Sequence, residues 1–592
     1  MLMSNKVTNL IAFILLAVMA GTAIFSMKND SLTFDELAHI PAGYSYLTKM
    51  DYRINPEHPP LIKDIPALPL LFLGLNFPDN SPSWIQEEAP PWWFQFNLGD
   101  EFLYSSGNNP EQIIFWSRLA MLGLLIFTGW FLFYWAKKIG GNFVALGTLS
   151  LFAFSPTFLA HGRLVNTDVG AVFGALIAIF FWLKFLENPT KPNIFLAGIA
   201  FGIAMVLKFS LILLIPFFVI ITIIYPILKN KNWKSIIIYA GKAFLAALIG
   251  LIFIIWPIYQ FHIWNYPPEQ QLRDTIADIS GHPLPLLRDI NLWMAQREIF
   301  RPFAQYMRGV LMASQRTMWG NTTFFKGEIS ADSWLGYFPL LYLLKIPLAF
   351  HFFTIFVLIG GAWRFWQILK NKSFFVIMRK NFILLAFCFW IAIYWAAALM
   401  GNLNIGLRHL LPAFPFIYIL VMSGMVWSLS GLNKISPKLK KIAVSFVFLL
   451  FIWYIYSSIL IFPHYLSYYN ELAGGPKQGY KIAVDSNYDW GQDFYRLLSF
   501  IEKNEIEKIY IDYFGGANEE YYLKEKYVPW RGLRDPDELP KGSYLAVSAT
   551  QLQGGRAEPV FGFDQPSGYY RWLDKYQPVA RAGNSIFIYY ID

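Results

Sequence analysis

The sequence has almost no cysteine and little charge for its length of 592 residues. Its one cysteine, Cys388, lies inside an apolar run, so the chain has no disulfide framework. Only 15% of the residues are charged, whereas 56% are hydrophobic and 19% are aromatic. This composition excludes an ordinary soluble globular protein and predicts a polytopic membrane protein with some water-exposed mass.

Several familiar functional motifs are also absent. The sequence has no phosphate-cradling glycine-rich loop of the usual spacing and none of the common zinc or serine-hydrolase patterns, so nothing in it indicates nucleotide chemistry. It has no internal repeat and no low-complexity tract. The formal net charge of +9 gives little support to nucleic-acid binding, because the positive residues lie in short loops between apolar runs.

What the sequence does contain is a series of apolar runs long enough to cross a bilayer. They cover about 8–26, 113–135, 142–160, 167–186, 209–228, 236–256, 337–361, 381–400, 405–430 and 441–462. A shorter run, 194–207, is separated from the next only by Lys208. A single helix over 194–228 would be roughly 50 Å long, far longer than a bilayer requires. We therefore predict a turn near Lys208 and eleven membrane segments, the first of them retained as an anchor.

The basic loops set the predicted orientation. Short loops at 137–138, 229–234, 364–380 and 434–441 carry lysine and arginine and all lie on the side that holds Lys6. The positive-inside rule makes this side the cytoplasm and predicts a multi-pass protein of the cell membrane, inner or plasma. Three larger pieces then face outward: 27–112, 257–336 and 463–592.

The outer tail is predicted to be a separate domain that follows a transmembrane domain over 1–462. Its pattern predicts a strand at 481–485, a helix at 492–503, a strand at 508–514 and further strands at 543–549 and 585–591, hence a compact extracytoplasmic α/β domain over 463–592. The stretch Asp485–Asp493 suits a turn whose side chains cap backbone N–H groups, with contact to a substrate as the alternative. Trp490 and the Tyr468-Tyr469 pair suit either stacking on sugars or a position at the bilayer interface, and we expect the interface.

Ionisable residues near the outer ends of the apolar runs are the candidates for chemistry. Unpaired charge next to apolar sequence is costly, so Asp168, Lys208 and Arg408 are the most telling. Each also has a structural interpretation: Asp168 favours a helix start, Lys208 can snorkel to the interface, and Arg408 can be an interfacial anchor. The larger set on this face is Asp35, Glu36, Glu57, His58, His161, Arg163, Asp168, Lys208, Arg408 and His409.

The first outer loop contains two neighbouring acids with different explanations. Thr33 and Glu36 match a capping box, so a helix cap explains Glu36 as well as catalysis does. Asp35 has no role in that box and is the better catalytic candidate. We expect His161 to be a surface residue rather than a ligand.

Carboxylates beside several cations at a lipid–water boundary suit one kind of reaction. A carboxylate takes a proton from a nucleophile, and the cations receive a departing anion. A phosphate that is still attached to a lipid would lie at this boundary, and Arg163, Lys208 and Arg408 would receive it.

Six motifs in a fixed order carry a resemblance to a known family. They are Asp35-Glu36, Pro56-Glu57-His58-Pro59-Pro60-Leu61, the acidic start of the fourth span at Asp168, Lys208-Phe209-Ser210, Gly406-Leu407-Arg408-His409-Leu410-Leu411-Pro412 and Asp485-Ser486-Asn487-Tyr488-Asp489-Trp490-Gly491-Gln492-Asp493. Their order and membrane side resemble the phospholipid-carrier-dependent glycosyltransferases of the GT-C superfamily, glycosyltransferase family 39. The relatives are the protein O-mannosyltransferases and the aminoarabinose-to-lipid-A transferases.

The resemblance implies an inverting transfer of a sugar from a polyprenyl-phosphate carrier to an extracytoplasmic protein, lipid or glycan. Asp35 matches the family's catalytic aspartate, and Asp168 matches its second acidic motif, which lines the same cavity. The resemblance thus makes Asp35 and Asp168 the expected catalytic residues. The resemblance leaves Glu36, His58, Arg163, Lys208, Arg408 and His409 as expected substrate-binding residues. The expected partners are the lipid-linked donor, the acceptor and membrane lipid, without nucleic acid.

A divalent metal is left open by the resemblance. Glu57 falls where the aminoarabinose transferases keep a metal-binding glutamate, and His282 matches their histidine partner by position only. In the mannosyltransferases that glutamate position is not acidic, and His58-Pro59-Pro60 matches better.

Two other functions remain as alternatives. A transporter would place its key polar residues near the bilayer midplane, often in symmetric pairs of broken helices. Here they gather at one end, and no half-to-half duplication is visible. A lipid-linked glycan polymerase or ligase would share the donor and differ only in the acceptor.

Overall fold

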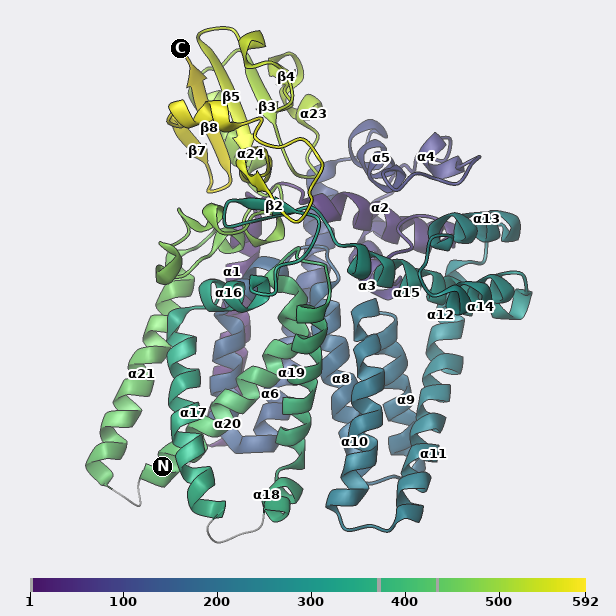
Figure 1. Ribbon diagram of the computed structural model, residues 1–592, viewed down its shortest axis with the longest axis vertical. Coiled ribbons are helices and arrows are strands. Elements are labelled where there is room, and N and C mark those ends of the chain that lie inside the picture. Colours follow the sequence, from purple (N-terminus) through teal and green to yellow (C-terminus); the bar gives the residue numbers. More distant parts are fainter. Residues whose placement is uncertain (1–3, 370–373, 433–435) are drawn as a thin grey trace.

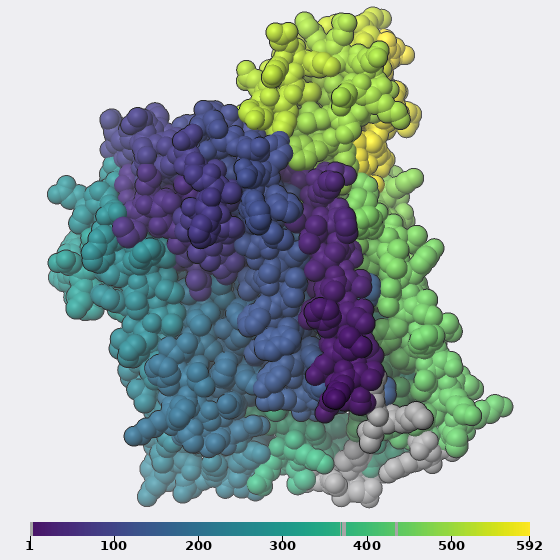
Figure 2. Space-filling model, turned by 180° about the vertical axis from the view of Figure 1, so that it is seen from behind, coloured from purple at the N-terminus to yellow at the C-terminus, as the bar shows by residue number. Residues whose placement is uncertain are grey.

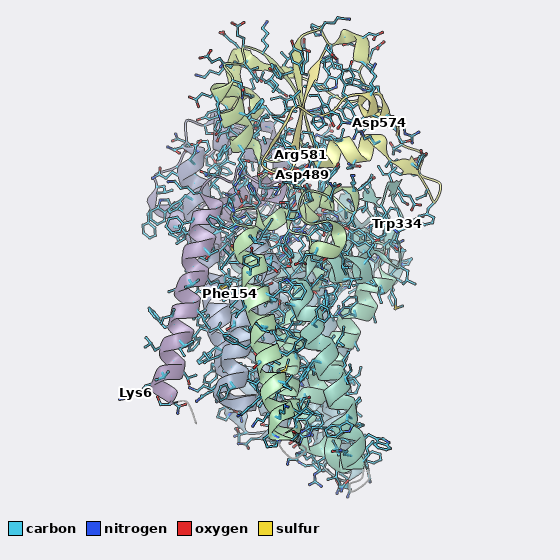
Figure 3. The ribbon with its side chains drawn as sticks, turned by 90° about the vertical axis from the view of Figure 1, so that its left-hand side faces the viewer. Lys6, Phe154, Trp334, Asp489, Asp574 and Arg581 are labelled. Carbon is cyan, nitrogen blue, oxygen red and sulfur yellow. The ribbon has the colours of Figure 1, made fainter. Side chains whose placement is uncertain are left out.

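The computed structural model describes residues 4–369, 374–432 and 436–592, so parts of two basic loops, 370–373 and 433–435, lie outside the described residues. The described chain forms a long bundle of helices with a sheet-containing unit on one end (Figure 1). The N-terminus lies at the end of the bundle opposite the C-terminus, and Figure 3 shows the same separation between Lys6 and the C-terminal unit.

Within these residues, nine helical stretches are long and apolar enough to cross a membrane. They contain α1 (Asn5–Met27), α6 (Pro110–Ala153), α8 (Asp168–Glu187), η3 (Phe209–Leu213) with α10 (Leu214–Leu228), α11 (Trp233–Gly250) with η4 (Leu251–Ile255) and α12 (Trp256–His262), α17 (Leu348–Leu369), α19 (Phe382–Met400), η6 (Leu407–Ala413) with α20 (Phe414–Leu432), and α21 (Pro437–Leu460). The predicted class, a polytopic α-helical membrane protein, is confirmed.

The predicted number of segments follows once two details are included. Helix α6 is interrupted at Gly141, whose φ of 78° and ψ of −168° are not helical. Such a conformation favours glycine, and it divides α6 into two crossings. The short apolar helix α9 (Lys191–Met205) supplies one more, so the nine stretches become eleven segments.

Local sequence signals account for where several spans begin. The side chains of Ser4, Asn109, Asn232 and Ser436 each accept a hydrogen bond from a backbone N–H in the first turn of α1, α6, α11 and α21, respectively. Proline follows two of these caps, as Pro110 and Pro437, where its missing N–H is not needed. Helix α8 is the most buried of the nine stretches and lies at the centre of the bundle.

One predicted span is shorter than expected. The apolar run at 337–361 is broken at Ile346-Pro347 into α16 (Tyr337–Lys345) and α17. Proline has no N–H with which to continue the helix. Lys345 is buried at the break, where its ammonium donates to the backbone carbonyls of Leu466, Tyr468 and Asn487. Only α17 therefore crosses.

The two large loops form a layer over one end of the bundle. The first loop contains α2 (Phe34–Lys49), α3 (Leu61–Ala67), η1 (Leu68–Phe72), α4 (Pro82–Ile85), α5 (Phe94–Asp100) and η2 (Glu101–Ser105). The second loop contains α13 (Pro268–Ile279), α14 (Pro285–Ala295), η5 (Glu298–Phe300), α15 (Arg301–Trp319), β1 (Thr323–Phe325) and β2 (Glu328–Ser330). From behind, the purple and dark-blue first loop lies beside and below the C-terminal unit (Figure 2). Strand β2 pairs with β6 (Glu558–Pro559), which joins the second loop to the tail.

The C-terminal unit is built on a five-stranded sheet of order β4-β3-β5-β8-β7. Strand β3 is parallel to β4 and β5, whereas β8 is antiparallel to β5 and β7. The elements are η7 (Tyr465–Ser467), η8 (Glu471–Ala473), η9 (Gly479–Lys481), η10 (Asp485–Asn487), α22 (Phe494–Lys503), β3 (Ile509–Asp512), α23 (Glu519–Leu523), η11 (Lys524–Lys526), β4 (Tyr527–Pro529), η12 (Pro536–Glu538), β5 (Ser543–Ser548), α24 (Ala549–Arg556), η13 (Arg571–Lys575), β7 (Ala580–Ala582) and β8 (Ile586–Ile591). The predicted helix at 492–503 and the strands at 508–514, 543–549 and 585–591 are confirmed within a few residues.

The strand predicted at 481–485 is wrong. The short helices η9 and η10 flank a link that makes one isolated bridge, between Ala483 and Phe325. This stretch packs against the bundle instead of joining the sheet: Asn487 accepts from the backbone N–H of Leu407 and donates to the Tyr337 hydroxyl. Tertiary contacts have therefore overridden a local strand preference.

Candidate active site

Four charged side chains from four parts of the chain meet at the loop-covered end of the bundle; we call them the Asp35 cluster. Arg408 Nη1 lies 3.2 Å from Asp35 Oδ2 and 3.5 Å from Asp168 Oδ2. Lys208 Nζ lies 2.5 Å from Asp168 Oδ1. The predicted convergence of these residues is thus present in the structure, with two carboxylates and two cations in direct contact.

Local structure explains how each member reaches the cluster. Asp35 is in the first turn of α2, whose capping box at Thr33 is formed as predicted. Asp168 opens α8, and its backbone N–H donates to the Asn166 side chain. Lys208 has extended backbone angles between α9 and η3, which is the predicted turn between two membrane segments.

The two carboxylates differ in access to solvent. The Asp168 side chain is fully buried and is paired with Lys208 and Arg408. The Asp35 side chain keeps 23% of its surface exposed, and Arg408 is its one ion-pair partner among the described residues. An acid with one weak contact and open surface is available to another molecule, whereas a fully paired buried acid is not.

Arg408 is held by the tail as well as by the two aspartates. Its Nε donates to Ser486 Oγ at 3.1 Å, and its guanidinium carbon lies 4.3 Å from the centre of the Trp490 ring. Its Nη2 makes no hydrogen bond to any residue in the described ranges, although the guanidinium carries donors on every nitrogen. One edge of this cation is therefore fixed while another is unoccupied.

The contribution of the tail was missed at the level of sequence. Trp490 is 1% exposed and stacks on Arg408, so the expectation of a bilayer-interface position is wrong, as it is for the buried pair Tyr468 and Tyr469. Burial raises the pKa of Asp485 to about 6, although the positive charge of Arg408 acts to lower it. Asp485 therefore lies close enough to the Asp35 cluster to interact electrostatically with Arg408. The motif at 485–493 was the sequence signal for this contribution of the tail. We interpreted it mainly as a turn whose side chains cap backbone N–H groups.

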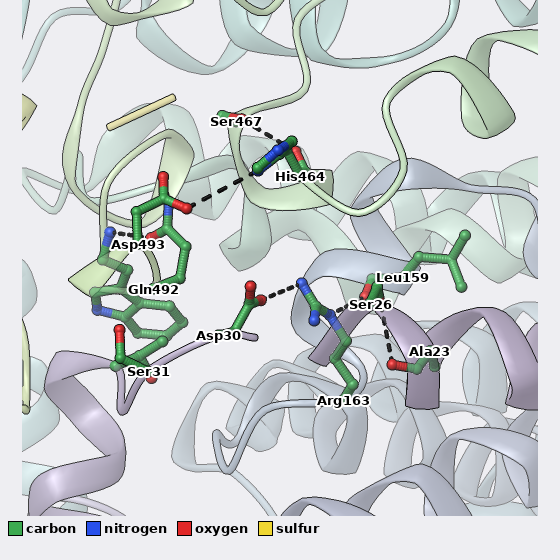
Figure 4. Close-up of polar contacts among 12 residues, drawn as sticks. Ala23, Ser26, Asp30, Ser31, Leu159, Arg163, His464, Ser467, Gln492 and Asp493 are labelled. Atoms are coloured by element: carbon green, nitrogen blue, oxygen red, sulfur yellow. Dashed lines mark hydrogen bonds and ion pairs between the residues drawn. The ribbon is translucent and has the colours of Figure 1, made fainter. Parts of the chain in front are cut away.

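A second group of buried charges joins the first loop, the junction before α8 and the tail; we call it the Asp30 cluster (Figure 4). Asp30 Oδ2 pairs with Arg163 Nη2 at 2.7 Å, and Asp30 Oδ1 pairs with Arg496 Nη2 at 2.8 Å. Arg496 Nη1 also pairs with Asp493 Oδ1 at 2.7 Å. Burial alone would raise the pKa of Asp30, but the guanidinium groups around it lower the pKa below its usual value.

These contacts place Arg163 away from its predicted role. The side chain is 1% exposed; its Nε donates to the Leu159 carbonyl, and its Nη2 pairs with Asp30 rather than with a member of the Asp35 cluster. Arg163 therefore ties the junction before α8 to the first loop, and substrate contact is not supported by its partners.

Glu36 is likewise used inside the protein. Both carboxylate oxygens receive donors: Oε2 accepts from the backbone and hydroxyl of Thr33 and from Arg118, and Oε1 accepts from Arg118 and the Val165 N–H. Burial favours a raised pKa for Glu36, but the Arg118 guanidinium brings the pKa below its usual value. The helix-cap interpretation of Glu36 therefore fits better than a contact with substrate.

The histidines near the site are largely desolvated. Burial lowers the pKa of His161 to about 3, and the side chain is 2% exposed, so the expectation that it lies on the surface is wrong. His58 packs edge-on against His39, with ring centres 5.2 Å apart, and burial lowers its pKa well below the usual value. Nε2 of His409 is buried and has no hydrogen-bond partner in the described part of the chain, so it remains a candidate for contact with a ligand.

The residues predicted for a metal do not fit one. Glu57 Oε2 pairs with Arg316 at 3.1 Å, and its other oxygen accepts from Trp92. Both ring nitrogens of His282 are engaged, one with Ser314 Oγ and one with the Leu284 N–H. No group of three or more His, Cys, Asp or Glu side chains in the described ranges is arranged to hold a metal ion. The Glu57–His282 pair stays a prediction that these contacts do not favour.

Comparison with known proteins identifies a related family. Residues 102–256 match the family model described as dolichyl-phosphate-mannose-protein mannosyltransferase. Over these residues, the family match confirms the predicted resemblance. The comparison with curated proteins found no match.

Solved structures with partial likeness include the following three. ArnT from Cupriavidus metallidurans bound to undecaprenyl phosphate has a TM-score of 0.45 and 12% identity, over 98% of this chain and 97% of that one. The apo oligosaccharyltransferase of Archaeoglobus fulgidus has a TM-score of 0.47 and 13% identity, over 89% of this chain and 64% of that one. The S. cerevisiae protein O-mannosyltransferase Pmt1-Pmt2 complex bound to the sugar donor has a TM-score of 0.32 and 19% identity, over 45% and 34%.

Proposed function

We propose that this protein is an inverting glycosyltransferase that takes a sugar from a polyprenyl-phosphate donor and passes it to an extracytoplasmic acceptor. The observation that carries the proposal is the Asp35 cluster, in which a partly exposed carboxylate is paired with Arg408, and Arg408 and Lys208 share Asp168. The match of residues 102–256 to a mannosyltransferase family supports the same class of reaction. The acceptor, whether protein, lipid or glycan, and the sugar are left to experiment.

In the proposed reaction, an acceptor hydroxyl or amine attacks the anomeric carbon of the sugar from the face opposite the lipid phosphate. The new bond to the acceptor forms as the bond from the anomeric carbon to the phosphate oxygen breaks. Asp35 accepts the proton of the acceptor, and the electron pair of the broken bond leaves with the lipid phosphate. One displacement of this kind inverts the configuration of the anomeric carbon.

The cations of the cluster receive the leaving group. Lipid phosphate is a weak base, so it needs positive charge rather than a proton. Arg408 presents an unoccupied Nη2, and Lys208 carries three donors of which the structure pairs one with Asp168. Asp168 holds both cations in place, because it contacts Lys208 and Arg408 at once. This arrangement supports Asp168 as a positioning residue and Asp35 as the base.

The membrane setting suits such a donor. The cluster lies where α8 and η3 begin and where the large loops cover the bundle, at the end opposite Lys6 (Figures 1 and 3). With Lys6 on the cytoplasmic side, as the basic loops predict, the cluster and the C-terminal unit face outward. A lipid phosphate in the outer leaflet would reach the cluster at this boundary.

The test is mass spectrometry of glycolipids and surface glycans in cells that lack this protein. We expect a lipid-linked sugar to accumulate and a surface product to disappear. Re-expression of the natural chain should reverse both changes, whereas Asp35→Asn should reverse neither while reaching the same level in the membrane.

Asp79→Asn provides a matched control in the same loop. It removes the same charge from a side chain that is 55% exposed and is paired with Lys49 rather than with the cluster. This variant should restore the product fully. An Asp35→Asn protein that clears the lipid-linked sugar as well as Asp79→Asn would overturn the proposed function.

A further inference from the structure

A cavity of about 520 Å³ opens at the far end of the bundle, away from the Asp35 cluster. It lies between the part of α6 just before its interruption at Gly141, the ends of α8 and α10 and the start of α19, with α18 (Phe374–Lys380) beside it. Helix α8 shows the separation: Asp168 opens it and Glu187 ends it, which at 1.5 Å per residue is roughly 30 Å. The cavity is therefore distinct from the proposed catalytic site.

Positive charge dominates the walls of this cavity. Five cations line it, and one carboxylate, Glu187, accompanies them; the cations are Lys138, Lys184, Lys229, Arg379 and Lys380. Within the described ranges, none of the five forms an ion pair with a carboxylate. Unpaired cations that converge on one volume repel one another, so an anion placed among them would be stabilised.

The remaining walls are apolar and aromatic. Trp135, Phe180, Leu183, Tyr225 and Phe382 are among the residues that line the cavity. Two of the cations lie over aromatic rings of this lining, Lys138 at 5.9 Å from the Phe180 centroid and Lys229 at 5.5 Å from the Tyr225 centroid. A site that combines cations with apolar and aromatic side chains suits an amphiphile with a charged head and a hydrocarbon chain.

We propose that this cavity binds the phosphate head group of an anionic membrane phospholipid. The cations would surround the phosphate, and the acyl chains would run along the apolar surface between the spans. Bound lipid would neutralise the repulsion among the cations and hold together the helix segments that carry them. The proposal is independent of the chemistry at the Asp35 cluster and of which leaflet the cavity faces.

The experiment measures the thermal unfolding midpoint of the purified full chain in neutral detergent. Phosphatidylglycerol, phosphatidylcholine and inorganic phosphate are titrated separately. We expect phosphatidylglycerol to raise the midpoint, and the other two to leave it unchanged. Inorganic phosphate that raises the midpoint and competes with phosphatidylglycerol would assign the cavity to a soluble phosphate compound and overturn the lipid proposal.

Two triple variants with equal loss of charge make the result specific. Lys138→Gln, Lys184→Gln and Lys229→Gln together remove three cations of the cavity and should weaken the apparent affinity for phosphatidylglycerol roughly a hundredfold, since each cation near an anionic lipid contributes about fivefold. Lys137→Gln, Lys234→Gln and Lys438→Gln together remove three charges that do not line the cavity. The control should keep the natural affinity.

The outcomes separate a built site from general surface charge. Equal weakening in both triple variants would show that the lipid is attracted by the basic surface as a whole, and would overturn the cavity proposal. If the cavity variant folds poorly, each of its three single substitutions is measured instead. Each single substitution should weaken the binding of phosphatidylglycerol several-fold. If none of them weakens it, the cavity proposal is likewise overturned.

Discussion

The Asp30 cluster and the Asp35 cluster have three parts of the chain in common, yet they differ in what their charges are free to do. Each takes an aspartate from the first loop, a residue from the junction before α8 or its first turn, and contacts from the tail. In the Asp30 cluster both oxygens of Asp30 are paired at 2.7 and 2.8 Å. In the Asp35 cluster Asp35 has one partner at 3.2 Å and keeps open surface.

The comparison shows that buried charge by itself does not mark a functional site. Both clusters bring opposite charges together where water is scarce, and both lie against the tail segment that ends at Asp493. What separates them is bonding capacity that solvent can reach. Asp35 keeps 23% of its side chain exposed, whereas Nη1 of Arg163 in the Asp30 cluster has no hydrogen-bond partner among the described residues but is buried. An exposed carboxylate beside a cation has room for a substrate, and a buried nitrogen does not.

The largest expected effect is on the rate at Asp35. With purified protein and the accumulated donor, Asp35→Asn should lower the transfer rate about a thousandfold, because it removes the proton acceptor. Its unfolding midpoint should stay close to that of the natural chain, since the partly exposed Asp35–Arg408 pair contributes little stability. A large fall in the unfolding midpoint would show that Asp35 stabilises the fold as Asp30 does, and the two clusters would then not differ in function.

Arg496→Gln tests the opposite cluster. It leaves Asp30 and Asp493 buried without their shared guanidinium, which is expected to lower the free energy of unfolding by about 3–5 kcal/mol. Protease should then release the tail at a lower temperature, while the transfer rate per folded molecule is retained. Arg534→Gln is the control, because its pair with Glu538 is 45% exposed on both sides and should change stability by less than about 1 kcal/mol.

Trp490 tests whether the tail positions the cation of the Asp35 cluster. A cation over an indole ring in a desolvated site is stabilised by about 2 kcal/mol, so Trp490→Leu should lower the rate roughly tenfold to thirtyfold. Trp490→Phe keeps an aromatic face and should recover a large part of the rate. Equal rates for the Leu and Phe variants would show that Trp490 only fills space beside Arg408.

The smallest expected effect concerns pH and Asp489, which lies at the base of the C-terminal unit (Figure 3). Burial raises the pKa of Asp489 from 3.8 to about 7, against the donors of Thr550. The folded protein therefore keeps a proton that the unfolded chain loses, and this stabilisation is full below pH 3.8 and is lost as the pH rises through about 7.

Asp489→Asn should remove this dependence. The asparagine oxygen can still accept from the Thr550 N–H, and the amide carries no charge at any pH. The unfolding midpoint of the natural chain should fall between pH 5 and pH 8 by about 1–2 °C more than that of the variant. Identical slopes for the two proteins would show that another group carries the pH dependence.

The sequence by itself determined the membrane architecture, because hydrophobic length and basic loops act locally. A span needs a minimum run of apolar residues, so the eleven segments and the turn at Lys208 could be predicted from the sequence. Local period also gave α22 and most of the sheet. The members of the Asp35 cluster could be identified because an unpaired charge next to apolar sequence is energetically unfavourable, so the charges that do occur there indicate a specific role.

Only the tertiary structure decided which charges are paired and with what. Arg163 and Arg408 look alike in the sequence, but Arg163 is matched by Asp30 and Arg408 is shared between Asp35, Asp168 and the tail. The tail segment does not form its predicted strand, because it contacts residues more than seventy positions away, as Asn487 contacts Leu407. Pairing energies of this kind depend on distance and burial in three dimensions, which neither composition nor spacing along the chain contains.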